Sequence, residues 1–199
     1  MDRIEGKRFG HPDLVTVQQQ VATALDEDLG TGDLTASLID STETSVATLI
    51  CREHAVLAGK CWFEQVFLSL DDNTIFDWRY KDGDDLPRGE KVCTLRGRTV
   101  ALLSAERTAL NFLQTLSGTA TLARRYAKSV IGKPVLIRDT RKTIPGLRHA
   151  QKYAGRCGGI TNHRVGLFDG ILIKENHIAA AGSIEKAVTT LRDLFPEKT

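Results

Sequence analysis

The sequence lacks the features that mark several large classes of protein. No apolar run approaches the roughly 18 residues that a membrane-spanning helix needs. The first seven residues, MDRIEGK, are too charged for the apolar segment of a secretory signal. No internal repeat or low-complexity segment is present. These absences argue against membrane, secreted, fibrous and disordered proteins.

Common catalytic and metal-binding signatures are also missing. The four cysteines are widely spaced and form no CxxC pair, so neither a zinc knuckle nor a disulfide framework is indicated. No HExxH or GxSxG motif occurs, and the glycines of residues 155–159 lack the spacing of a phosphate-binding loop. We expect a helix end and a turn at residues 155–159. The four cysteines are expected to be buried or half-buried thiols in a reducing cytoplasm, and no metal is expected to be held by the protein itself.

The composition that is present suits a globular protein of one or two domains. Of the 199 residues, 41% are hydrophobic and 26% are charged. Residues 1–50 hold three Lys and Arg against nine Asp and Glu, whereas residues 138–176 hold eight against three. A basic segment in a nearly neutral chain favours a local anionic ligand, although a solvated basic face has the same charge count.

The first half mixes helices and strands without regular alternation. Apolar spacing predicts helices near residues 14–29 and 62–70, and β-branched and aromatic runs predict strands at 44–51, 74–80 and 91–95. A long helical stripe follows and, after an interruption at Gly118, resumes at Leu122 and Tyr126. We therefore expect an α+β sandwich domain over residues 1–116. The stripe itself comprises Leu102, Ala105, Ala109, Phe112 and Leu116.

The second half alternates short apolar runs with helical patterns. Residues 134–137 and 170–173 are predicted strands, residues 147–156 are a predicted helix, and Ser183 is a predicted N-cap of a helix that ends before Pro196. Polar loops are expected after each strand. This order indicates parallel βα units, so residues 117–199 are expected to form the first part of an incomplete α/β barrel.

Basic residues follow both predicted strands. Ligands of parallel α/β folds bind where the carboxyl ends of the strands meet, so these side chains are expected in one mouth. Arginine matches carboxylates and phosphates in a fork, and lysine supplies a compact charge. The candidates are Arg141, Lys142, His163, Arg164 and Lys174.

Each candidate also has an ordinary structural interpretation. Arg141 and Lys142 are equally typical of an exposed loop, and a lone histidine such as His163 more often has a structural hydrogen bond. Only Lys174, which directly follows an apolar strand, favours function by itself. The residues Arg148, Lys152 and Arg156 lie four apart and predict a solvated helix face, and Glu106–Arg107 predicts a surface ion pair.

Four motifs together resemble a known enzyme family. Taken in order, they resemble quinolinate phosphoribosyltransferase, the carboxylating nicotinate-nucleotide pyrophosphorylase of NAD biosynthesis. They are EDLGTGDLTA (27–36), SAERTALNFLQTLSG (104–118), DTRKTIPGLR (139–148) and CGGITNHRVGLFDGILIKENHI (157–178). The resemblance implies a sandwich followed by an incomplete barrel, and a symmetric homodimer. It also implies further barrel strands after Thr199, so we expect a chain truncated on that side.

The resemblance implies a reaction and assigns residues to it. Quinolinate and phosphoribosyl pyrophosphate would give nicotinate mononucleotide, pyrophosphate and carbon dioxide, with Mg²⁺ bound by the phosphorylated substrate. Lys142 would lie near the phosphates, and Lys142 and Lys174 are the candidate catalytic residues. Arg107 would reach the neighbouring subunit's site. Arg141, His163, Arg164 and Lys174 would surround the carboxylates of quinolinate.

Two other functions remain open at this point. A related phosphoribosyltransferase would use nicotinate, which lacks the second carboxylate that a pocket with Arg107, Arg141 and Arg164 would hold. A non-catalytic anion- or nucleic-acid-binding module would need aromatic residues among the cations. Residues 138–176 contain only Tyr153 and Phe168, which argues against that module.

Overall fold

The computed structural model describes Gly10 and residues 12–198, so the charged segment of residues 1–7 lies outside the described residues. The chain divides into two compact units. The first comprises the described residues up to Asp139 together with Thr143–Asn162. The second comprises Thr140–Lys142 and the chain from His163 onward.

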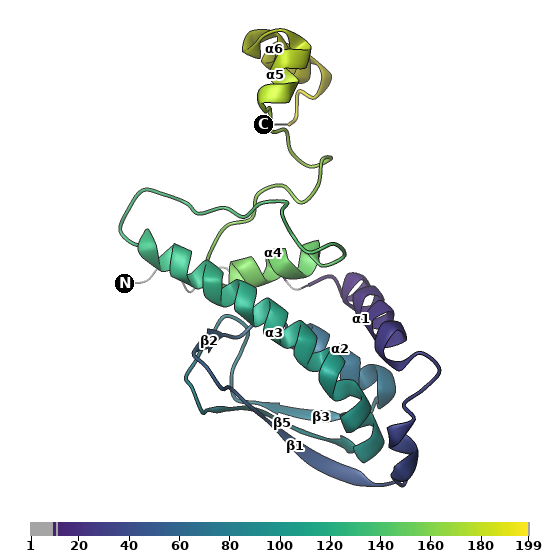
Figure 1. Ribbon diagram of the computed structural model, residues 1–199. Helices are drawn as coiled ribbons and strands as arrows, with labels where there is room; N and C mark the ends of the chain where they lie inside the picture. Colours follow the sequence, from purple (N-terminus) through teal and green to yellow (C-terminus); the bar gives the residue numbers. More distant parts are fainter. Residues whose placement is uncertain (1–9, 11, 199) are drawn as a thin grey trace. The chain divides into compact units, whose positions relative to one another are not determined.

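A three-stranded antiparallel sheet lies at one end of the first unit (Figure 1). Strand β5 (Lys91–Arg98) is central, and β1 (Thr44–Ile50) and β3 (Ile75–Trp78) pair with its two edges. The register joins Thr44 to Arg98 and shifts between Leu49 and Ile50, where the pairing is irregular. Strands β2 (Ala55–Val56) and β4 (Asp85–Leu86) form a separate short pair. The three predicted strands of the sheet are thus confirmed.

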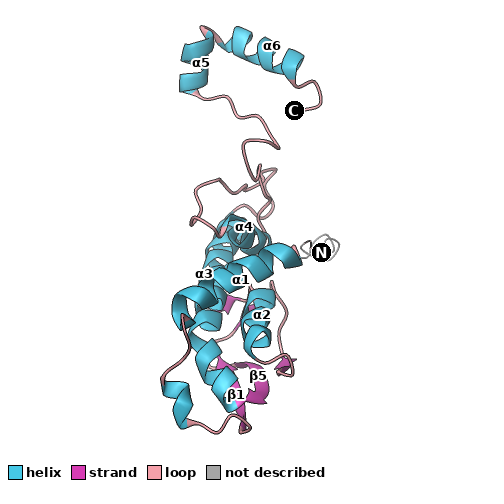
Figure 2. Cartoon of the chain, turned by 90° about the vertical axis from the view of Figure 1, so that its right-hand side faces the viewer, coloured by secondary structure: helices cyan, strands magenta, loops and turns pink. Residues whose placement is uncertain are grey.

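Two helices cover one face of this sheet and build the core (Figure 2). Helix α2 (Lys60–Leu70) brings Phe63 against Phe76 and Trp78 of β3, with ring centroids 6.4 and 5.4 Å apart. Helix α3 (Thr99–Ser129) begins directly after β5. Trp62, the residue before Phe63 in α2, is 1% exposed and donates from Nε1 to Gln20 of α1 (Leu14–Leu29). Burial of these aromatic rings contributes about 1.5–3 kcal/mol each to folding.

Helix α3 is one continuous helix of 31 residues. The predicted stripe from Leu102 to Leu116 is buried, as expected. The predicted interruption at Gly118 is wrong, because Gly118 is an exposed helical residue within α3. The predicted continuation is also wrong: Leu122 and Tyr126 are 54% and 57% exposed. The buried face continues instead through Ala120 and Ala123, whose small side chains admit a close neighbour.

That close neighbour is helix α4 (Arg148–Cys157), which also matches its predicted position. The helix ends at Gly158, and Gly159 follows with φ +97°, so the predicted helix end and turn are confirmed. A Cβ placed on Gly158 would lie 2.4 Å from the Ala120 carbonyl oxygen and 2.5 Å from the Ala123 Cβ. Glycine is therefore required where α4 ends against α3.

The second unit contains two short helices. Helix α6 (Ile184–Leu194) begins after Ser183, whose Oγ accepts from the Lys186 N–H at 3.1 Å, so the predicted N-cap is confirmed. Helix α5 (Glu175–Ala181) occupies a segment that we predicted as a polar loop, and that prediction is wrong. Its sequence, ENHIAAA, ends in three alanines, which have the highest helix propensity. An η1 turn (Thr35–Leu38) in the first unit completes the elements.

The two predicted parallel strands do not form as strands. Residues 134–137 and 170–173 have irregular backbone, and one parallel bridge joins Arg138 to Thr161. A parallel strand depends on neighbouring strands for its hydrogen bonds and on helices to cover its faces. Leu136 is accordingly 72% exposed. The α/β class is retained, with the barrel incomplete in this chain.

Within the described residues, no helix combines the length and the apolar character needed to cross a membrane. All four cysteines are free, and each is buried or half-buried, as predicted.

Replacing Gly158 by alanine is expected to destabilise the first unit by about 1–3 kcal/mol, because the new methyl group would overlap α3 backbone. Gly118→Ala is the matched control on α3, because a Cβ there meets nothing within 4 Å. The control is expected to gain up to about 1 kcal/mol from helix propensity. Urea unfolding of the two variants measures both effects. Equal stabilities would show that the close approach at Gly158 is unnecessary.

Candidate active site

Five of the six predicted site residues belong to the second unit. Arg141 and Lys142 group with the chain from His163 onward, although residues 143–162 separate the two segments in sequence. The grouping brings both halves of the predicted cation set into one compact unit. Their convergence on a single cavity stays a prediction. The five residues are Arg141, Lys142, His163, Arg164 and Lys174.

Arg141 has the most unusual environment of the five. Its side chain is half-buried, and its Nε is fully buried without a hydrogen-bond partner among the described residues. Leaving a buried N–H donor without a partner lowers stability by about 1–3 kcal/mol, so this group is well suited to donate a hydrogen bond to a bound anion. Lys142 is exposed, and its backbone N–H donates to Thr140 Oγ1 at 3.1 Å.

His163 and Arg164 are held by local hydrogen bonds. The Arg164 N–H donates to His163 Nδ1 at 2.7 Å, which places the proton of a neutral imidazole on Nε2. Arg164 Nη1 donates to the Gly170 carbonyl at 2.9 Å. Asp169 closes the loop between Arg164 and Gly170, because its carboxylate accepts from the N–H groups of Val165 and Gly166, each at 2.8 Å. The guanidinium is thus oriented before any ligand binds.

Lys174 lies at the N-cap of α5 rather than at the end of a strand. Its backbone N–H donates to His177 Nδ1 at 3.0 Å, and its side chain is exposed. The strand that motivated this candidate is not formed. Lys174 still follows an apolar segment, and its side chain is exposed at the start of α5.

Arg107 lies on α3 in the first unit and is exposed. The adjacent Thr108 is buried and donates from Oγ1 to Asp28 Oδ2 of α1 at 2.8 Å. Packing of Thr108 therefore fixes this turn of α3 and leaves Arg107 directed to solvent.

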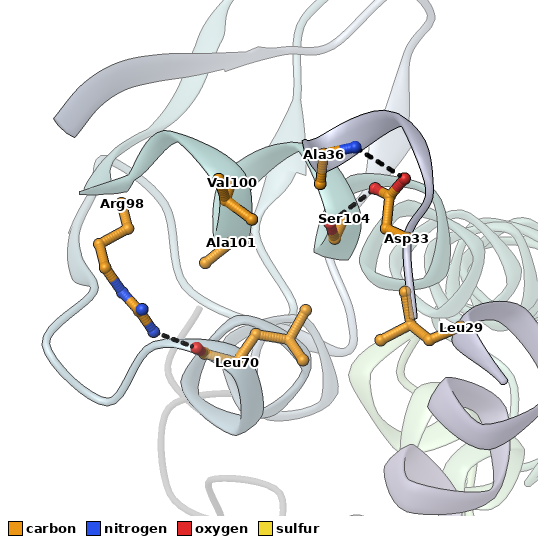
Figure 3. A pocket seen from close by; sticks show the side chains of 8 residues that line it. All are labelled: Leu29, Asp33, Ala36, Leu70, Arg98, Val100, Ala101 and Ser104. Atoms are coloured by element: carbon orange, nitrogen blue, oxygen red, sulfur yellow. Dashed lines mark hydrogen bonds between the residues drawn. The ribbon is translucent and has the colours of Figure 1, made fainter. Parts of the chain in front are cut away.

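Two cavities of the first unit are lined by none of the six candidate residues. The larger, of about 500 Å³, lies between α1, α3 and the Pro145–Leu147 loop and includes Glu27 and Asp28. The smaller, of about 280 Å³, is shown in Figure 3. There Arg98 donates to the Leu70 carbonyl at 2.6 Å, and Ser104 donates to Asp33 at 2.7 Å. That hydroxyl is the main cause of the lowered pKa of Asp33. Glu27 and Asp28 of the larger cavity do not suit an anionic substrate.

Sequence analysis missed a buried polar network in the first unit. Lys152, predicted to be solvated, is 3% exposed, and its Nζ lies 2.7 Å from Asp139 Oδ1. The predicted solvated face is therefore wrong at its centre, while Arg148 and Arg156 are half-buried. Asn162 joins the network by donating to Asp139 Oδ2 at 2.6 Å. No sequence signal marked Lys152, because its partner lies in a distant loop.

Comparisons with known proteins identify the family of this chain. Residues 33–117 match the family model for the N-terminal domain of quinolinate phosphoribosyl transferase, and residues 119–199 match its C-terminal domain. A solved nicotinate-nucleotide pyrophosphorylase from Francisella tularensis superposes with a TM-score of 0.91 at 43% identity. It covers 98% of this chain, which in turn covers 69% of it.

The chain belongs to the quinolinate phosphoribosyltransferase family.

Curated relatives have the same family membership. A probable carboxylating nicotinate-nucleotide pyrophosphorylase from Bacillus subtilis is 46% identical over 83% of this chain. One from Synechocystis is 39% identical over 93% of it. The chain spans 57% and 63% of the length of these two relatives.

Three of the four cysteine thiols lie in environments that disfavour the thiolate. Burial raises the pKa of the Cys93 and Cys157 thiols to about 12. Burial also raises the pKa of Cys61. These three side chains are protonated at neutral pH, so they are poor nucleophiles.

The nucleic-acid alternative loses its remaining support. Tyr153 is 8% exposed, with its ring centroid 5.6 Å from that of Trp62, so it offers no stacking surface. In residues 138–176 only Phe168, at 77% exposure, is an accessible aromatic side chain. Stacking platforms for single strands use several such rings.

Replacing Lys152 by methionine is expected to destabilise the first unit by about 3–5 kcal/mol, because the buried Asp139 carboxylate would lose its cation. Lys186→Met, at an exposed position of α6, is the control and should change stability by less than about 0.5 kcal/mol. Chemical unfolding followed by circular dichroism provides the measurement. A loss below about 1 kcal/mol for Lys152→Met would show that the ion pair has no net structural role.

Proposed function

We propose that this chain transfers phosphoribose from phosphoribosyl pyrophosphate to quinolinate, with loss of carbon dioxide, to give nicotinate mononucleotide and pyrophosphate. The observation that carries the proposal is the half-buried Arg141, whose Nε lacks a partner, in one unit with His163, Arg164 and Lys174. Quinolinate has two carboxylates, and each needs a positive partner once it is desolvated.

The cations divide by the chemistry they match. Arg141 and Arg164 offer forks that fit carboxylates in bidentate geometry, and His163 adds a donor from Nε2. Lys142 and Lys174 are exposed point charges, which suit phosphates and the reacting carboxylate. Charge-assisted hydrogen bonds of this kind contribute about 1.5–3 kcal/mol each.

The transfer needs no protein nucleophile. The pyridine nitrogen of quinolinate attacks the anomeric carbon while pyrophosphate departs, so positive character develops on the ribose. The C2 carboxylate then leaves as carbon dioxide, its bonding electron pair stays on C2 beside the cationic ring nitrogen, and C2 takes up a proton from solvent. The protein contributes orientation and electrostatic stabilisation, which together account for large rate enhancements in other enzymes. Lys142 and Lys174 are the proposed catalytic residues.

Mg²⁺ is proposed to bind together with phosphoribosyl pyrophosphate. In the described part of the chain, no three His, Cys, Asp or Glu side chains gather into a metal site. Mg²⁺ commonly keeps several waters and binds through substrate phosphates, so the donor set fits a metal carried by the substrate. When bound, the ion neutralises charge on the departing pyrophosphate. The role of this chain would be to hold the remaining phosphate charge through Lys142.

The proposal includes a symmetric homodimer with a shared site. Arg107 is exposed on the first unit. A two-fold pairing would let Arg107 of one protomer enter the site of the other. A cytoplasmic location completes the proposal, supported by four free cysteines.

Changing Arg141 to alanine is expected to weaken quinolinate binding by about 2–5 kcal/mol, or roughly thirtyfold and more, because a carboxylate loses its partner. Binding of phosphoribosyl pyrophosphate should change much less. Titration calorimetry with each substrate separately makes the comparison. Arg138→Ala, three residues earlier and exposed, is the matched control. Equal losses for both substrates would contradict the carboxylate assignment.

Mixing Arg107→Ala and Lys174→Ala variants tests the shared site. Each variant alone is expected to be nearly inactive. After subunit exchange, half of the dimers carry one intact site, so activity should recover to about a quarter of wild type. The measurement is the steady-state rate together with proof of exchange by mass spectrometry of differently tagged subunits. Exchange without recovery would place Arg107 outside the partner's site.

A further inference from the structure

A buried polar network lies where the chain leaves the first unit. The chain passes into the second unit after Asp139 and again after Asn162. Asn162 Nδ2 donates to Asp139 Oδ2 at 2.6 Å, so one side-chain hydrogen bond joins the two departure points. Lys152 Nζ holds the other oxygen of Asp139 at 2.7 Å.

Asn162 is the centre of this network. The same Nδ2 also donates to the Lys152 carbonyl at 3.0 Å. Its Oδ1 accepts from Arg156 Nη1. Both ends of one neutral amide are therefore used, and they join a loop residue to two successive turns of α4.

The backbone strengthens the same junction. The Asp139 N–H donates to the Thr161 carbonyl at 3.1 Å, and the Thr161 N–H donates to the Ile137 carbonyl at 2.9 Å. This is the parallel bridge between Arg138 and Thr161. Two hydrogen bonds do not make a sheet, so the side chains of the network hold the two segments in register.

Stability alone does not explain such a network. A buried ion pair can often be replaced by apolar residues of similar volume with no loss of stability, because desolvation offsets the attraction between the charges. Its geometry, by contrast, is specific, since each hydrogen bond requires a defined direction. The network therefore suits a role in placing chain segments.

We propose that Asn162 is a positioning residue for the substrate-binding cations. Its hydrogen bond to Asp139 fixes the distance between two chain segments. One segment continues to Arg141, and the other continues to His163 and Arg164. Arg141 lies two residues after Asp139 in the sequence, and His163 directly follows Asn162. The inference rests on the proposed function, in which these cations hold the two carboxylates of quinolinate.

Three variants separate positioning from general stability. Asn162→Ala removes the bridge but leaves the Lys152–Asp139 ion pair. Tyr153→Phe is the matched control on α4, because it removes the hydrogen bond from Oη to Asp82 at 2.7 Å and keeps the ring that lies 5.6 Å from the Arg156 guanidinium. Asn162→Asp keeps the size of the side chain and an oxygen for Arg156, but it places a carboxylate oxygen where the amide donates to Asp139, so it removes the bridge in the same way.

The first measurement is amide hydrogen exchange without substrate. In Asn162→Ala, the amides of residues 140–142 and 163–164 are expected to exchange about tenfold faster or more, because the junction opens locally. Tyr153→Phe should leave these amides unchanged, and Asn162→Asp should exchange as fast as Asn162→Ala. Unchanged exchange in Asn162→Ala would overturn the proposal, whatever the protein binds.

The second measurement is titration of quinolinate into each protein. Asn162→Ala is expected to bind about tenfold more weakly at unchanged stoichiometry, with phosphoribosyl pyrophosphate affected less than about threefold. A merely structural loss would lower the binding stoichiometry and leave the dissociation constant unchanged, which would overturn the proposal. The same weakening in Asn162→Asp would support it, because that variant keeps the size of the side chain.

The two measurements keep this proposal and the proposed function apart. If the wild-type chain binds no quinolinate, the proposed function fails, and the substrate-related part of this inference fails with it. If the wild-type chain binds quinolinate while Asn162→Ala matches it in exchange rates and affinity, only the positioning role is overturned.

Discussion

The packing of α3 is the constraint on which the first unit depends. Its buried face meets the sheet and α2 along its first half and α4 along its second half. The second contact is close because Ala120 and Ala123 are small and Gly158 has no side chain. Arg124 reinforces it by donating to the carbonyls of Cys157 and Gly158, each at 3.0 Å. The position of α4, and thus of everything α4 carries, follows from that approach.

What α4 carries is a buried charge. Lys152 brings an ammonium group into the interior, and its stability there requires the Asp139 carboxylate. Helix α4 thereby fixes the position of Asp139, a loop residue thirteen positions before Lys152. A helix that packs through small residues and pairs through one buried lysine links the core to the segments that bear the candidate site. The residues that pack the core are therefore different from the candidate site residues, and the Lys152–Asp139 ion pair joins the two groups.

The candidate site was partly accessible to sequence reasoning. Basic residues after two apolar runs pointed to Arg141, Arg164 and Lys174, because the carboxyl ends of parallel strands would meet at one edge of a sheet. The strands that motivated this reasoning did not form, since parallel strands require neighbours that the described residues do not supply. Arg107 was invisible to residue-by-residue reasoning, because an exposed arginine on a helix has the same pattern whether or not a second subunit uses it. Resemblance to the family supplied that candidate.

The sequence by itself determined the local elements. Periodicity, caps and turn residues specified α1, α2, α4 and α6 and the three strands of the sheet, because each depends on side chains within a few positions. Only the tertiary structure decided which face of α3 is buried beyond Gly118 and that Lys152 is an interior residue. It also decided that Asn162 joins two distant chain segments. These outcomes depend on partners far away in sequence, and a helical pattern does not reveal whether a charged side chain will meet water or a carboxylate.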